Sequence, residues 1–261
     1  MVEKLRIVSL SIHHLSFRES LTTVMQWAKD RQPSYVCFAN VHMTIEAHKS
    51  SAFLEQLDNA SLVVSDGKPL ATACYALYRK KQERISGMDF MPAAIEMADK
   101  ESLTIFLYGS SPEVLDTLRE KITRQYPALR IGGMISPPFR PLTREETAAH
   151  IGQINRSGAQ LVFVSLGCPK QEKWMADHYK EINAVLLGVG GAFPVMANLQ
   201  RRAPKWMQNY GLEWFYRLLL EPGRMFRRYF ETNSLFLYLM GIERLKRLRK
   251  RSGTDHTHSS N

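Results

Sequence analysis

Short apolar runs alternate over residues 1–200 with longer stretches in which apolar residues recur at helical spacing. The runs that show this most clearly cover residues 34–40, 61–67, 103–111, 160–168 and 183–191. Runs that are apolar throughout suit strands buried on both faces of a sheet, and intervening helices are typical of parallel strand connections. We therefore predict an α/β fold in which a mainly parallel, Rossmann-like sheet is flanked by helices.

The C-terminal part of the chain has a different composition. From residue 201 onward there are 13 Lys and Arg against 5 Asp and Glu, a surplus of 8 within the net charge of +10. This asymmetry predicts an α/β domain over residues 1–199, a basic helical appendage over 200–251 and a disordered tail over 252–261. A basic element of this kind seeks an anion, which leaves nucleic acid, phosphorylated metabolites and acidic membrane surfaces open.

Cysteine usage and hydropathy indicate the compartment. Cys37, Cys74 and Cys168 are scattered without metal-ligand spacing, which fits a reducing environment. The N-terminus lacks the apolar core of a signal peptide, and no apolar run approaches the ~20 residues that cross a bilayer. We expect a cytoplasmic protein with at most peripheral membrane contact.

Candidate site residues follow from the ends of the predicted strands. Ligands of open parallel sheets bind beyond the carboxyl ends of the strands. The residues expected there are Asn40, His42, Asp66, Gly67, Gly109, Ser110, Ser111, Gly167, Lys170, Gln171, Gly190 and Gly191. Prolines 112 and 169 stand near the first turns of two following helices, whose free N–H groups can meet an anion.

Each of these candidates has a functional and a structural interpretation. Asp66 ends an apolar run, so its carboxylate could act as a general base, or it could simply form an Asp-Gly turn. Gly190 and Gly191 could bring a phosphate or sugar close to the backbone, or form a tight strand-to-helix turn. Lys170 and Gln171 could reach a ligand at a helix start, or be ordinary polar residues of a first turn. These alternatives stay open at the level of spacing alone.

The same residues argue against two kinds of site. Phe193 stands where the dinucleotide fingerprint requires a glycine, so a Rossmann cofactor site is not expected. His42 and His48 lack zinc-helix spacing, and there is no Asp-x-Asp pair. We expect no metal and no cofactor, and protein cations would have to neutralise a diphosphate.

Arginines and a proline break mark the appendage. Pro222 and Gly223 lie between Arg217 and the pair Arg224 and Arg227, which predicts two helices meeting near Glu221. The cations could then converge on an anion, or form a solvated basic face. Residues 229–251 alternate an apolar stripe with a dense basic end, which favours a helix on a membrane surface or one docked on the domain.

Several motifs taken together resemble those of the WecG/TagA/CpsF family of bacterial glycosyltransferases. In order they are FANVHM, DGKPL, RISGMDF, LYGSSPEV, GCPKQEKWM, GVGGAFPVMA and the stretch from Arg201 to Tyr229. The resemblance spans most of the chain, from the first predicted strand to about Arg228. It implies transfer of a sugar from a UDP-sugar to a polyprenyl-diphosphate-linked saccharide, inverting and metal-independent, in the biosynthesis of a cell-surface polysaccharide.

The resemblance also assigns roles. It implies Asp66 as the catalytic base, Gln171 as a second catalytic-site residue, and Arg217, Arg224 and Arg227 as the cations that neutralise the diphosphate. Beside these we expect substrate contacts at Asn40, Gly109, Ser110, Lys170, Gly190 and Gly191. The appendage is implied to act as a lid at the inner face of the cytoplasmic membrane, with no nucleic-acid partner and a possible homo-oligomer.

One position departs from the family pattern. Many members have a threonine two residues before the asparagine of the first motif, and Phe38 stands here instead. The departure implies altered acceptor contacts or a different donor sugar. Two other functions are weighed beside glycosyl transfer: nucleic-acid binding through the basic C-terminus, which has no accompanying recognition motif, and a non-catalytic membrane-peripheral scaffold.

Overall fold

The computed structural model is built around one six-stranded parallel sheet, and it describes residues 2–255. The side chains of Arg224, Arg228 and residues 248–255 are outside that description. The strand order is β4-β3-β8-β7-β5-β6. The strands are β3 (Ser34–Ala39), β4 (Leu62–Ser65), β5 (Thr104–Gly109), β6 (Arg130–Ile135), β7 (Leu161–Ser165) and β8 (Val185–Gly188). The predicted α/β class is confirmed, and five of these strands are the five predicted apolar runs.

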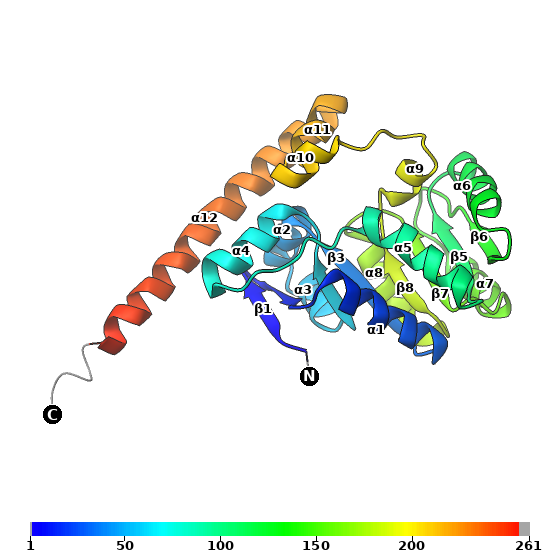
Figure 1. Ribbon diagram of the computed structural model, residues 1–261, viewed down its shortest axis with the longest axis horizontal. Helices are drawn as coiled ribbons and strands as arrows, with labels where there is room; N and C mark the ends of the chain where they lie inside the picture. The colour runs from blue at the N-terminus through cyan, green and yellow to red at the C-terminus, as the bar shows by residue number, and fades with distance from the viewer. Residues whose placement is uncertain (1, 256–261) are drawn as a thin grey trace.

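Helices cover both faces of the sheet (Figure 1). One face carries α1 (Phe17–Lys29), α5 (Gly87–Lys100), α6 (Pro112–Gln125) and α9 (Ala192–Met196). The other carries α2 (Val41–Lys49), α3 (Ser51–Asp58), α4 (Lys68–Tyr78), α7 (Arg144–Arg156), α8 (Lys170–His178) and the short 3₁₀ helix η1 (Tyr179–Glu181). Strands β3 and β5 are buried along their whole length because apolar side chains from both layers pack against them. Two apolar clusters therefore form, one on each face of the sheet.

Two elements escaped the prediction. Residues 4–13 form an antiparallel hairpin of β1 (Lys4–Ile7) and β2 (Leu10–His13). The ring Nδ1 of His13 accepts a hydrogen bond of 3.0 Å from the Val63 N–H. The hairpin therefore provides a partner for a backbone N–H on the outer edge of β4. Strand β6 lies at the other edge and carries Gly132 and Gly133, where a Cβ on Gly133 would come within 2.5 Å of the Phe106 ring. Because two glycines interrupt it, β6 has no continuous apolar run, and the apolar pattern did not predict it.

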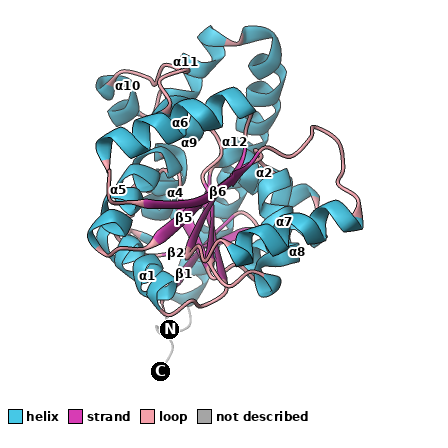
Figure 2. Ribbon diagram, turned by 90° about the vertical axis from the view of Figure 1, so that its right-hand side faces the viewer, coloured by secondary structure: helices cyan, strands magenta, loops and turns pink. Residues whose placement is uncertain are grey.

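The appendage consists of three helices, α10 (Lys205–Tyr210), α11 (Glu213–Leu220) and α12 (Pro222–Asp255). The predicted break near Glu221 is confirmed. In both ribbon views α10 and α11 lie beyond the sheet at one end of the long α12 (Figures 1 and 2). Helix α12 continues to Asp255, although the sequence predicts a disordered tail from residue 252. Residues 256–261 lie outside the described part of the chain.

The side of α12 that faces the domain follows helical periodicity. Thr232 and Phe236 are buried, and Leu235, Leu239 and Met240 pack against the apolar cluster of that face. Further along, the Arg247 guanidinium lies 4.2 Å from the centre of the Tyr78 ring and donates to its hydroxyl. One side of residues 229–251 therefore docks on the parent domain, and contact with a membrane stays a prediction. Among described residues, no helix is long and apolar enough to cross a membrane.

Candidate active site

A hollow of about 840 Å³, partly open to solvent, lies between the carboxyl ends of β3 and β4 and the appendage. We call it the appendage hollow. The domain and the appendage both line it, through Asn40, Val41, His42, Asp66, Gly67, Lys68, Pro69, Ser86, Met88, Gly211, Glu213, Trp214, Arg217, Tyr229, Thr232 and Asn233. Residues far apart in sequence thus meet here because the appendage folds back over the sheet edge.

Asp66 is placed in this hollow by the end of β4. Its N–H donates to the Ala39 carbonyl at 2.6 Å, and Gly67 follows with φ +102°, a conformation that favours glycine. The Asp-Gly turn and the placement of the carboxyl group in the hollow are therefore parts of the same structure. Burial raises the pKa of Asp66 to about 7, with Glu213 adding to the rise and Arg84 and Arg217 opposing it. A carboxyl with such a pKa can take a proton near neutral pH.

Arg217 belongs to α11 and lines the same hollow. Its Nη2 lies 3.9 Å from the Met88 sulfur, and a Cβ built on Gly191 would come within 3.2 Å of that nitrogen. The guanidinium is therefore close to the backbone that follows β8. This places a cation beside the glycine turn and within electrostatic range of Asp66.

The other two predicted arginines are not placed in this way. Arg227 is exposed, and its Nε pairs with Glu231 at 2.8 Å. Tyr229, two positions further along α12, lines the hollow. Side chains two positions apart on a helix point about 200° apart, so Arg227 points away from the hollow. The backbone of Arg224 lies in the first turn of α12, and its side chain is outside the described part. The structure therefore shows one of the three expected cations in the hollow.

Gln171 has a different position from the one expected of a catalytic residue. It is buried at the start of α8, where its Oε1 accepts from the Gly167 N–H and its Nε2 donates to the Gly188 carbonyl. The same Nε2 donates to Glu172, whose pKa burial raises to about 7. These contacts hold the loops after β7 and β8 together under Gly190. The amide supports the floor of the site and does not line the appendage hollow.

A second hollow, of about 930 Å³ with part of it open to solvent, lies beyond β5 and β7. We call it the loop hollow, since the proline-rich residues 137–142 form one wall together with Tyr108, Ser110, Thr147, Ser165, Leu166, Lys170 and Trp174. The Tyr108 and Trp174 rings stack with centres 4.2 Å apart. Gly109 has φ +109°, and a Cβ there would come within 2.4 Å of the Ser165 oxygen, so only glycine fits. Two of the predicted substrate contacts, Ser110 and Lys170, line this hollow.

The two hollows are neighbours along one sheet edge. The Ser165 hydroxyl of the loop hollow donates to the Gly190 carbonyl at 2.7 Å, and Gly191 approaches Arg217 of the appendage hollow. Asn40 contributes to the appendage hollow while its side-chain oxygen caps α2 by accepting from the Met43 N–H. The predicted strand-end residues thus form a continuous path, with Gly190 and Gly191 between the two ends.

Phe38 is not part of either hollow. It is 3% exposed and packs edge-on against the Phe90 ring, with centres 5.1 Å apart. The aromatic ring at this position therefore fills the core under β3. Phe38 is not among the described residues that line the two hollows, so a direct contact with a bound acceptor is not expected there.

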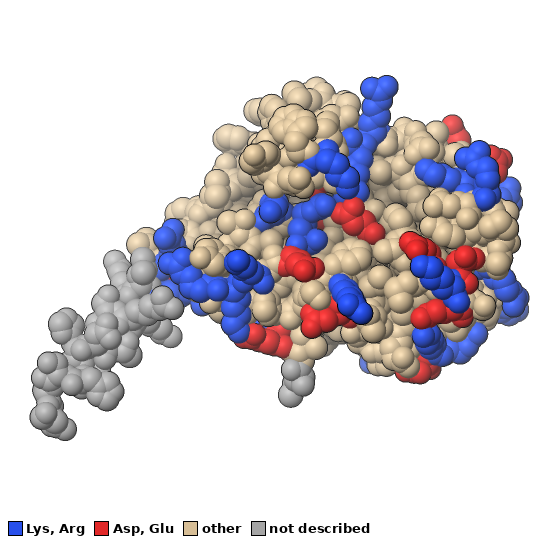
Figure 3. Space-filling model, viewed as in Figure 1, with Lys and Arg blue, Asp and Glu red and all other residues tan. Residues whose placement is uncertain are grey.

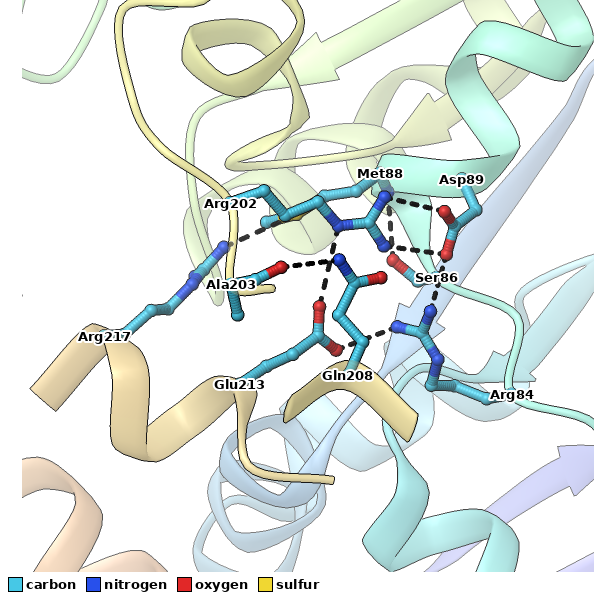
Figure 4. Close-up of polar contacts among 9 residues, drawn as sticks. All are labelled: Arg84, Ser86, Met88, Asp89, Arg202, Ala203, Gln208, Glu213 and Arg217. Carbon is cyan, nitrogen blue, oxygen red and sulfur yellow. Dashed lines mark hydrogen bonds and ion pairs between the residues drawn. The ribbon is translucent and has the colours of Figure 1, made fainter. Parts of the chain in front are cut away.

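Several site residues were not predicted. Trp214 and Tyr229 place their rings 5.9 Å apart at the wall of the appendage hollow. Arg84, Asp89, Arg202 and Glu213 form an ion network beside it (Figure 4). The motifs RISGMDF and RRAPKWMQNYGLEW contained these residues, but the pairing between them requires the fold. Within the described side chains, no group of three or more His, Cys, Asp or Glu is arranged to hold a metal ion.

A parallel sheet with a carboxyl group and an arginine at one hollow beyond its carboxyl edge is typical of ligand-binding and catalytic sites of α/β proteins. Comparison with known proteins identifies the family. The model of the glycosyl transferase WecG/TagA/CpsF family matches residues 5–250, and the chain belongs to that family of glycosyltransferases. This favours glycosyl transfer over the nucleic-acid-binding and scaffold alternatives.

A curated relative is similar over most of the chain. It is the N-acetylglucosaminyldiphosphoundecaprenol N-acetyl-beta-D-mannosaminyltransferase of Bacillus subtilis (strain 168), 33% identical over 187 residues. The alignment covers 71% of this chain and 71% of the relative.

Proposed function

We propose that this chain transfers a sugar from a UDP-sugar to a polyprenyl-diphosphate-linked saccharide, with inversion at the anomeric carbon. The single observation that carries this is Asp66 and Arg217 lining one hollow at the carboxyl edge of the sheet. The name of the B. subtilis relative specifies an undecaprenol-diphosphate-linked N-acetylglucosamine as its acceptor and N-acetylmannosamine as the transferred sugar. A related donor and acceptor, in the synthesis of a cell-surface polysaccharide, are the first to test here.

The proposed reaction uses Asp66 as the general base. Its carboxylate takes the proton of the acceptor hydroxyl, and the hydroxyl oxygen forms a bond to the anomeric carbon. The bond between that carbon and the phosphate oxygen breaks, and UDP leaves with the electron pair. Arg217 stabilises the charge that develops on the diphosphate, and the backbone of Gly190 and Gly191 allows the phosphates to approach closely.

The donor is proposed to lie along the path between the two hollows. Its sugar occupies the appendage hollow at Asp66, its diphosphate passes Gly191 and Arg217, and its nucleoside enters the loop hollow near Ser110 and Lys170. The stacked Tyr108 and Trp174 pair gives that hollow an apolar, aromatic wall of the kind that suits a nucleobase. Arg224 remains a proposed diphosphate ligand, because its backbone starts the helix adjacent to Arg217.

The membrane is proposed to meet the appendage at the α11–α12 corner. The exposed apolar side chains there are Phe215, Leu219, Leu220, Phe226 and Phe230, and Trp206 of α10 is also exposed. Figure 3 shows a broad tan surface around this end of the molecule, with lysines and arginines nearby. An apolar corner with adjacent cations suits an anionic bilayer surface and would bring a lipid-linked acceptor to the appendage hollow.

Two experiments test these proposals. The protein is incubated with a panel of UDP-sugars that includes UDP-N-acetylmannosamine, together with a short-chain polyprenyl-diphosphate N-acetylglucosamine. We expect acceptor-dependent UDP release and a lipid product heavier by one sugar, with the new linkage inverted by NMR. UDP release that does not depend on the acceptor would refute transfer.

For the membrane, vesicles containing anionic lipid are floated with wild type and with the double variant Leu219→Glu and Leu220→Glu. We expect the variant to lose vesicle binding, while the matched variant Leu237→Glu on the exposed side of α12 keeps it. Equal binding by all three proteins would reject the corner as the contact.

A further inference from the structure

Four charged side chains join the α/β domain to α11. Arg84 precedes α5, Asp89 is in its first turn, Arg202 is in the segment that leads to the appendage, and Glu213 begins α11. Figure 4 shows them in one group, with Arg202 and Arg84 each between the two carboxylates. We call them the α11 latch.

The contacts of the latch are close. Arg202 forms a bidentate pair with Asp89, with distances of 2.7 and 2.8 Å, and Arg84 reaches Asp89 at 2.7 Å. Arg84 also donates to Glu213 at 2.8 Å, and the Arg202 Nε lies 3.7 Å from the other Glu213 oxygen. Every member therefore has two partners of opposite charge, so the group is neutral as a whole.

Burial makes this latch different from surface ion pairs. Its side chains are between 17% and 29% exposed, whereas the Lys100–Glu96 pair on α5 is 67% and 53% exposed. Burial alone would raise the pKa of Asp89, but the hydrogen bond and charge of Arg202 and the charge of Arg84 hold it below its ordinary value. Partly desolvated pairs of this kind lose more on removal of one partner than exposed pairs do.

The position of Glu213 links the latch to the site. It is four residues before Arg217, so the two side chains lie on the same side of α11, one turn apart. The turn before α11 is fixed as well, because a Cβ on Gly211 would come within 2.7 Å of the Lys68 side chain. Fixing Glu213 therefore fixes the turn of α11 from which the Arg217 side chain extends.

We propose that Glu213 is a positioning residue for sugar transfer: held by Arg84 and Arg202, it fixes α11 on the domain so that Arg217 faces the hollow containing Asp66. The proposal rests on the proposed function for its catalytic part. If Glu213 only held α11 in place, its charge would not affect the proton affinity of Asp66. We expect an effect, because Glu213 and Asp89 add negative charge near Asp66, and Arg84, Arg202 and Arg217 add positive charge.

The test compares full-length wild type with Glu213→Gln, which keeps the shape and removes the charge, and with Glu96→Gln, which removes a carboxylate from an exposed pair. Hydrogen exchange is measured in peptides covering α11. We expect Glu213→Gln to exchange there ~10-fold faster or more, and Glu96→Gln to match wild type. Unchanged exchange in Glu213→Gln would overturn the latch.

The second arm measures transfer against pH. With Glu213 neutral, Asp66 should lose its proton more easily, so the acid limb of kcat moves to lower pH while kcat on the plateau falls about tenfold. The other groups near Asp66, His42 of α2 and Lys68 of α4, are the same in both proteins. A limb that stays in place, or moves to higher pH, would contradict the proposal.

Glu213→Asp keeps the charge with a shorter reach and provides a second variant. It should loosen α11 while moving the acid limb less than Glu213→Gln does, and an equal displacement of the limb in both variants would contradict the electrostatic part. If wild type transfers no sugar at all, the proposed function fails. Hydrogen exchange then still decides whether Glu213 holds α11.

Discussion

The two hollows along the sheet edge are built from different materials. The loop hollow is walled by prolines and stacked aromatic rings together with Arg140 and Lys170, whereas the appendage hollow combines a carboxyl group, an arginine and the nearby α11 latch. Both occupy the position that the strand-end rule gives to ligands. The difference teaches that the charged centre needs both parts of the chain, Asp66 from the α/β domain and Arg217 from the appendage, whereas the α/β domain alone builds the loop hollow. We therefore expect changes in the appendage hollow to affect turnover and changes in the loop hollow to affect affinity.

The largest effect is expected from Asp66→Asn. Loss of the general base should lower kcat by ~10²–10⁴-fold and leave UDP affinity nearly unchanged. Steady-state kinetics and calorimetric UDP titration measure the two quantities. Asp116→Asn, on the exposed surface of α6, is the matched control and should behave as wild type. Near-normal turnover in Asp66→Asn would remove the base from the mechanism.

Arg217→Ala should follow, with a decrease of about 10²-fold in kcat, because it removes a cation from the developing diphosphate charge. Arg217→Lys keeps the charge without the planar fork and should recover part of the activity. Arg119→Ala, in an exposed pair on α6, serves as the control. Full activity and unchanged donor affinity in Arg217→Ala would break the assignment of charge to the appendage hollow.

In the loop hollow the expected change is smaller. Lys170 is exposed, so Lys170→Ala should weaken UDP binding about threefold and leave kcat unaffected. Lys173→Ala, on the same helix but beside the Phe53 ring, should not change UDP binding. A large loss of kcat with unchanged affinity in Lys170→Ala would reverse the roles given to the two hollows.

The smallest effect is on stability. The folded-state pKa of Asp66 is about 7 against an ordinary value of 3.8, so stability is highest below the lower value and falls as pH rises through the higher one. Asp66→Asn should therefore raise the melting temperature more at pH 8 than at pH 5. Glu172, whose pKa is also raised to about 7, stays in both proteins and cancels from the difference. An equal change at both pH values would contradict the burial of the Asp66 charge.

Much of the fold followed from local patterns. The five apolar runs became buried strands because each is short and apolar throughout, and Pro222 ended α11 because its ring cannot continue a helix. The hairpin and β6 were missed because a turn at Val8 and two glycines interrupt their patterns. Pairing of edge strands depends on neighbours, which spacing along the chain does not describe.

The sequence by itself determined the strand ends and therefore the edge at which Asp66, Ser110 and Lys170 are placed. Only the tertiary structure decided what each side chain does there. The side-chain oxygen and nitrogen of Gln171 both form hydrogen bonds to backbone groups. Phe38 packs in the core, and Arg227 pairs with Glu231 away from the hollow. Periodicity fixes which way a side chain leaves its own element. Which partner that side chain meets depends on the tertiary structure, and the partner can come from a segment more than a hundred residues away, as Glu213 does for Arg84.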